Sequence, residues 1–119
     1  MDSIINGLLR IQQQLRILHW QTKSYARHKA YGKTYDELGD LIDEFMEVQM
    51  GKYGRFSLQD KVIPLENLEE MTVSDFIDDS IAFLTDLTNK VDPKDSDLLN
   101  IRDEMLAKMN RLKYLLTLK

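Results

Sequence analysis

The residues of this chain that could bind a metal ion lie in one stretch, residues 18–47. This stretch holds both histidines of the protein, His19 and His28. It also holds the densest acidic stripe, in which Asp43 and Glu47 are one helical turn apart and share one face of the expected helix. Imidazole nitrogens and carboxylate oxygens together suit iron, manganese or zinc. The residue types therefore indicate a transition-metal site.

The spacing of these residues excludes the simplest form of that site. Fifteen residues separate His28 from Asp43, and on one helix they span roughly 22 Å, so the two side chains of one chain cannot share an ion. They could do so between two chains if a two-fold axis set the two helices antiparallel. His19 and His28 of one subunit would then meet Asp43 and Glu47 of the other. An acidic pair at this spacing is also common on solvated helix faces, which is the simpler interpretation.

Four helices are expected to position these residues. Apolar residues recur at alternating spacings of three and four, for example at Ile4, Leu8 and Ile11, which is typical of amphipathic helices that bury one stripe. Asp92 and Pro93 pair a capping residue with the residue favoured at the first helical position, so a helix is expected to begin there. The expected helices cover residues 3–23, 28–52, 73–90 and 93–118.

The segment between the second and third of these helices has a different pattern. Residues 53–71 contain Pro64, show no sustained period and allow only a short helical turn near residues 65–70. Such a length is unusual for a connection inside a compact domain. In a helical bundle it suits a crossover from one end to the other, which joins two parallel helices. We therefore expect an all-α, four-helix bundle with its long crossover between helices 2 and 3.

Composition narrows the class of protein further. The chain has 119 residues, few prolines and glycines and no cysteine, so we expect one domain, residues 1–119, without disulfides or thiolate metal sites. No apolar run approaches the roughly 20 residues that span a bilayer, and no signal-peptide pattern is present, so a cytoplasmic protein without membrane contact is expected. The net charge is −4, yet residues 1–35 carry six basic side chains against one acidic. This asymmetry fits complementary packing of helices or subunits, or one face for a polyanion and another for cations or basic neighbours.

The central stretch resembles the Dps family, the mini-ferritins of the ferritin-like superfamily. The family's motif has LHW in the first helix, a histidine at the start of the second and then D-x-x-x-E. The matching residues here are Leu18-His19-Trp20, His28, and Asp43 with Glu47. The closing helix, residues 97–116, is also similar to that of mini-ferritins, and the crossover lies where the family has it. The chain further resembles small ferritin-like proteins of phages and other viruses, which share this shortened form.

The resemblance implies a ferritin-like bundle that forms a homo-oligomer, with a two-fold dimer as its minimum unit. In the family, ferrous iron is oxidised at di-iron sites between subunits, commonly by peroxide, and is stored in a hollow shell. Carried over to this chain, the metal ligands would be His19, His28, Asp43 and Glu47, with Trp20 near the site. The implied activity is that of a ferroxidase, with iron as its substrate.

A second interpretation makes the chain a non-enzymatic structural or packing protein that is associated with the virion and its other proteins. Three departures from the family favour it. The loop between the two histidines is about three residues shorter, Gly32 stands where mini-ferritins usually keep an acidic residue, and the lysine-rich N-terminal tail is missing. DNA binding is not expected from either interpretation, because the chain is acidic overall and lacks such a tail.

Overall fold

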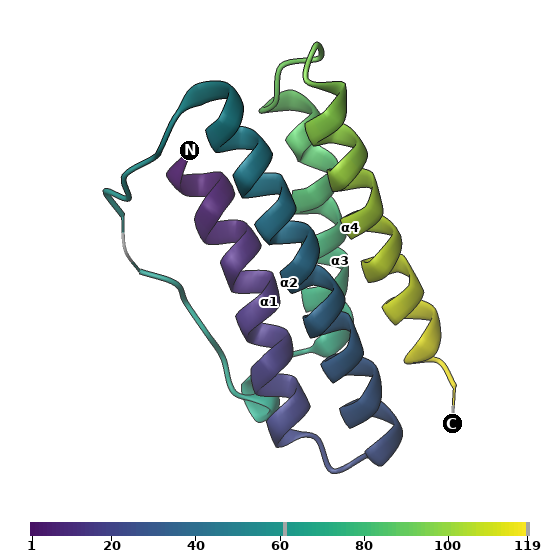
Figure 1. The fold of residues 1–119 in the computed structure, drawn as a ribbon. Coiled ribbons are helices and arrows are strands. Elements are labelled where there is room, and N and C mark those ends of the chain that lie inside the picture. Colours follow the sequence, from purple (N-terminus) through teal and green to yellow (C-terminus); the bar gives the residue numbers. More distant parts are fainter. Residues whose placement is uncertain (61, 119) are drawn as a thin grey trace.

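The computed structural model describes residues 1–60 and 62–118, and its architecture within these ranges is all-α, with four α-helices and no strand (Figure 1). The predicted all-helical class and the number of long helices are therefore confirmed. Two short 3₁₀ helices precede and follow α3. The elements are α1 (Asp2–Gln21), α2 (Tyr25–Tyr53), η1 (Leu68–Glu70), α3 (Val73–Asp86), η2 (Leu87–Asn89) and α4 (Ser96–Leu115).

The order of the helices in space follows from the connections (Figure 1). A tight turn makes α1 and α2 an antiparallel hairpin, and a long segment then returns the chain to the opposite end, so that α3 runs parallel to α2. A second turn sets α4 antiparallel to α3, and α4 packs against both α2 and α3. No helix in the described part of the chain is long and apolar enough to cross a membrane.

The start of α2 lies three residues before the position expected from the sequence. Ser24 is its N-cap, and the Ser24 hydroxyl oxygen accepts a hydrogen bond from the Arg27 amide at 3.2 Å. A capping serine satisfies one of the amide donors that a helix leaves free at its first turn. Of residues 24–27, which were expected to connect the first two helices, residues 25–27 therefore belong to α2. His28 lies inside the first turn of α2 rather than before it.

The predicted start of the fourth helix is also wrong, because α4 begins at Ser96 and not at residue 93. The Asp92 carboxylate accepts a hydrogen bond from the Lys94 amide at 2.9 Å, and the Asp92 carbonyl accepts one from the Asp95 amide at 2.9 Å. Asp92 therefore folds the chain into a turn, which is the other structure that an Asp-Pro pair favours. Asp95 becomes the N-cap instead. The expected third helix is also shortened, because its last turn, η2, is 3₁₀.

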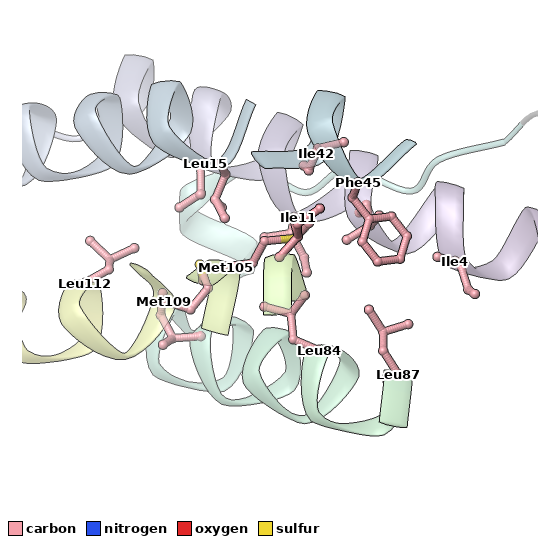
Figure 2. Packing of buried hydrophobic residues seen from close by; sticks show 14 of the residues in the cluster. Ile4, Ile11, Leu15, Ile42, Phe45, Leu84, Leu87, Met105, Met109 and Leu112 are labelled. Atoms are coloured by element: carbon pink, nitrogen blue, oxygen red, sulfur yellow. The ribbon is translucent and has the colours of Figure 1, made fainter. Parts of the chain in front are cut away.

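The core is the seam that the apolar periodicity predicted. Figure 2 shows side chains of all four helices directed into one interior, among them Leu15, Phe45 and Met105. Tyr35 and Ile81, which follow the same apolar spacing in α2 and α3, are only partly buried. The fully buried set with the largest side chains is Tyr31, Phe45, Leu8, Leu15, Leu18, Leu38, Ile77, Leu84, Leu87, Leu98, Met105 and Met109. Burial of apolar surface on this scale is the main favourable term in folding.

The crossover from Gly54 to Asn67 runs along the outer side of α1 (Figure 1). It is bound there by polar side chains of α1 at helical spacing. Asp2 accepts hydrogen bonds from the amides of Gln59 and Asp60, both at 2.9 Å. The fully buried Gln14 side chain exchanges two hydrogen bonds of 2.9 Å with the backbone of Glu66. These bonds satisfy backbone groups of the crossover, whose described residues, 54–60 and 62–67, lie in no helix or strand.

Candidate metal centre

The two histidines meet where α1 ends and α2 begins. His19 is in the last turn of α1 and His28 is in the first turn of α2, and only Thr22, Lys23 and Ser24 connect the helices. The imidazole rings are stacked, with their centroids 3.8 Å apart and their planes 15° from parallel. The short connection therefore brings the two side chains into contact within one chain.

Reciprocal hydrogen bonds fix the orientation of both rings. His19 Nδ1 lies 2.7 Å from the carbonyl oxygen of His28, and His28 Nδ1 lies 2.8 Å from the carbonyl oxygen of His19. A carbonyl oxygen can only accept, so each Nδ1 must carry the proton and donate. In the neutral ring the lone pair then lies on Nε2. Neither Nε2 atom forms a hydrogen bond within residues 1–60 and 62–118.

This arrangement is the one that metal-binding histidines usually have. A ligating imidazole commonly donates its second N–H to a carboxylate or a backbone carbonyl, which fixes the tautomer and makes the other nitrogen a better ligand. Here each histidine supplies the carbonyl that orients the other. The chain thus presents two oriented Nε2 lone pairs at one end of the α1–α2 hairpin.

The carboxylates lie elsewhere on α2. Asp43 and Glu47 are both exposed, and neither forms an ion pair in the part of the chain that the structure describes. By contrast, Glu37 on the same helix is paired with Lys108 of α4. Because α2 is continuous from Tyr25 to Tyr53, the rise per residue puts Asp43 about 22 Å from His28. The structure brings the histidines together and leaves the two acids apart from them.

Across residues 1–60 and 62–118, no group of three or more histidine, aspartate or glutamate side chains could hold a metal ion. The two histidines lie at one end of the α1–α2 hairpin, and Asp43 and Glu47 lie far along α2, so these four side chains do not meet within one chain.

Trp20, expected near the site, follows His19 on α1 and is 62% exposed. The Arg16 guanidinium lies 4.8 Å from the centre of its indole ring and donates a hydrogen bond to the Tyr35 hydroxyl at 3.1 Å. A tryptophan and an arginine that stack on a protein surface are the residue types most enriched at the energetic centres of interfaces. The pair therefore places an exposed aromatic ring and a cation together beside His19.

Shifted pKa values occur at the opposite end of the bundle. Hydrogen bonds from the Tyr53 hydroxyl and the Lys52 ammonium group lower the pKa of Asp95, and hydrogen bonds to Asp97 and Asp95 raise the pKa of Lys52. Lys52 Nζ lies 2.9 Å from Asp95 and 2.7 Å from Asp97. These side chains connect the end of α2 to the start of α4. Their pKa shifts therefore follow from contacts that hold the two helices together.

Sequence reasoning identified the two histidines but missed how they interact. The hydrogen bonds between the two histidines are accepted by backbone carbonyl oxygens. Every residue has such an oxygen, so the residue types give no sign of these bonds. The signal that could have indicated them is the capping serine at position 24, since it starts α2 early enough to place His28 in a helical turn beside His19.

Fold and site define an all-helical protein with a long crossover and a pair of oriented histidines. Compared with known protein families, residues 19–116 match a family of unknown function, DUF5856. The chain belongs to this family. It is also similar to the "Uncharacterized 14.6 kDa protein in mobD-ri intergenic region" of Enterobacteria phage T4, with 46% identity over 54 residues. The match covers 45% of this chain and 42% of the phage protein. No solved structure shows significant similarity to the chain.

Proposed function

We propose that this protein is a ferritin-like, Dps-related homo-oligomer that binds ferrous iron between its subunits and oxidises it. His19 and His28 of one subunit supply Nε2 ligands, and Asp43 and Glu47 of a second subunit supply oxygens. The observation that carries the proposal is the reciprocal pair of Nδ1–H···O=C bonds, at 2.7 and 2.8 Å, which leaves both Nε2 lone pairs free for a metal.

A two-fold axis across α2 would bring the two half-sites together. With the two copies antiparallel, the histidine end of one helix meets the acidic middle of the other. Charge favours this pairing, because Arg27, Lys29 and Lys33 are exposed at the start of α2 while its carboxylates follow. The exposed Trp20 and Arg16 add an apolar and cationic anchor beside His19.

The ligand set suits the chemistry. Imidazole and carboxylate together accept both ferrous and ferric iron, and added carboxylate charge favours the ferric product. With hydrogen peroxide as the oxidant, each molecule of peroxide takes one electron from each of two ferrous ions and, with two protons, forms two molecules of water. Iron is the substrate and cargo of this reaction. The chain's own part is to hold the ions close together and to fix the imidazoles.

Anaerobic titration of the purified protein with ferrous iron, with its mass determined by light scattering, tests the proposal. We expect saturable binding of about one or two irons per subunit in a multimer. His28→Ala should weaken binding by more than the about 10–100-fold that follows from loss of an outer hydrogen-bond partner, because it removes a ligand itself. Asp43→Ala/Glu47→Ala should do the same. Addition of peroxide to the loaded protein should then yield ferric iron.

Asp75→Ala/Asp79→Ala is the matched control, because it removes an exposed acidic pair of the same spacing from α3. It should leave iron binding unchanged. If the wild type assembles yet binds no more iron than the His28→Ala variant, the ferroxidase proposal fails. The favoured function would then be structural, as a packing protein of a virus particle. The similarity to a phage T4 protein supports that second candidate.

A further inference from the structure

Gly32 lies one turn after His28 on α2, directly beside the His19 ring. A Cβ atom at Gly32 would come 2.8 Å from His19 Cε1 and 2.9 Å from His19 Nδ1. Carbon atoms at optimal contact are about 3.5–4.0 Å apart, so even a methyl group would overlap the ring. The backbone of Gly32 is helical and has no positive φ, so the conformation is open to any residue. Space alone excludes a side chain there.

The His19 ring has little room to move away from such a methyl group. The face of the ring stacks on His28 at a centroid distance of 3.8 Å, and Nδ1 is bound to the His28 carbonyl oxygen. The edge that would meet the methyl group, Nδ1 with Cε1, is the same edge that donates this bond. Any displacement that relieves the overlap therefore lengthens the hydrogen bond or opens the stack.

We propose that Gly32 is a positioning residue, whose missing side chain forms the slot in which the His19 imidazole is held with its proton on Nδ1. The consequence for metal binding rests on the proposed function, whereas the positioning of the ring does not. An acidic side chain at this position would compete with His19 for the same space.

Two other glycines of α2 provide matched controls. A Cβ atom at Gly39 would meet only the flexible end of Gln12, with Nε2 at 2.6 Å, and a Cβ atom at Gly51 would meet nothing within 4 Å. The flexible glutamine can rotate away, and the open position needs no change. Alanine at each of these positions gains helix propensity without touching a histidine.

The first experiment is nuclear magnetic resonance of the imidazole nitrogens in the metal-free protein, for the wild type, Gly32→Ala, Gly39→Ala and Gly51→Ala. We expect the wild type to show His19 and His28 with the proton on Nδ1. In Gly32→Ala, His19 should shift to a mixture of tautomers typical of a free ring, while the two controls keep the wild-type spectrum. An unchanged His19 spectrum in a folded Gly32→Ala variant would overturn the proposal.

A double-mutant cycle of thermal stability tests the same proposal if Gly32→Ala folds poorly. In a His19→Ala background the slot is empty, so Gly32→Ala should raise Tm by about 2–4 °C through helix propensity. In the wild-type background the same substitution should give no gain or a loss. Equal effects in both backgrounds would mean that residues 19 and 32 do not interact, and the proposal would be wrong.

Ferrous-iron titration separates this inference from the proposed function. If wild-type protein binds iron, Gly32→Ala should weaken binding by about 10–100-fold, as expected when a ligand loses its orientation. If the wild type binds no iron but the Gly32→Ala spectrum changes as described, the positioning role holds and the proposed function fails. Binding that is equal in both variants, with a changed spectrum, would overturn the role of Gly32 in metal binding.

Discussion

Phe45→Ala is expected to lower the free energy of unfolding by about 3–5 kcal/mol, the typical cost of removing a buried aromatic ring. Phe45 is fully buried, and Figure 2 shows its ring directed from α2 into the shared interior. A chain of 119 residues has a total stability of roughly 6–18 kcal/mol, so the loss is a large share of it. Urea unfolding should show a lower midpoint with an unchanged slope.

Val48→Ala is the control for this prediction, because Val48 lies on the same helix and is only partly buried. Its loss should cost about 1 kcal/mol. Equal destabilisation by the two substitutions would contradict the packing of α2, since it would mean that Phe45 contributes no more to the interior than a residue at its edge.

Arg102→Ala is expected to cost about 2–3 kcal/mol, the second-largest effect on stability. Arg102 of α4 is only 9% exposed and donates from Nη1 to the carbonyl oxygens of Leu84 and Thr85, at 2.9 and 3.2 Å, and to the Thr88 hydroxyl at 2.8 Å. The last carbonyl groups of a helix have no partner within it, so a cation there satisfies them and opposes the helix dipole. The Arg102 guanidinium, which belongs to α4, thereby caps the C-terminal end of α3.

Thermal unfolding of Arg102→Ala beside Arg111→Ala measures this effect. Arg111 is about half exposed and its closest carboxylate atom, on Glu37, is 3.8 Å away, so its removal should cost no more than about 1 kcal/mol. Arg102→Lys should not restore stability, because one ammonium group cannot serve both the α3 carbonyl oxygens, which accept from Nη1, and the Asp103 carboxylate, which accepts from Nε. A fully stable Arg102→Lys protein would contradict the cap and leave only a role for charge.

Much of the fold follows from local rules that the sequence displays. Leu8, Leu15 and Leu18 lie on one helical stripe, and they are buried because that stripe faces the interior of the bundle. The short helical turn expected near residues 65–70 is also present, as the 3₁₀ helix Leu68–Glu70. Boundaries were less predictable. Asp92-Pro93 fits a turn as well as a helix start, and only contacts of Asp95 with α2 decide between them.

The attachment of the crossover illustrates what local rules miss. Gln14 appears as a surface residue in a polar run, yet it is completely buried because it bonds to the backbone of Glu66, fifty-two residues further along. Asp2, Asn6, Arg10 and Gln14 recur every four residues and each bonds to the crossover. A polar row at helical spacing beside the apolar stripe is the signal that could have predicted this.

For the proposed site, residue types and spacing predicted His19 and His28 as one half and Asp43 with Glu47 as the other. The distance between the histidines and the two carboxylates follows from the rise of a helix, so it was predictable. The orientation of the imidazoles was not, because it depends on two backbone carbonyls and on the space left by Gly32. Such interactions arise only when a three-residue connection sets two helix ends together.

Each proposed metal site combines residues of two subunits. Subunit complementation tests this arrangement most directly. One subunit carries His19→Ala/His28→Ala and the other carries Asp43→Ala/Glu47→Ala, and the two are co-expressed with different affinity tags and purified as a mixed complex. Each variant alone has no complete site. In a two-fold pair of the two variants, one site regains all four ligands and the other has none.

The mixed complex should therefore bind ferrous iron with wild-type affinity at about half the wild-type capacity, while each parent variant shows no saturable binding. Complexes of each variant with wild-type subunits serve as the reference for capacity. A mixed complex that assembles yet binds no more iron than its parents would contradict the site between subunits.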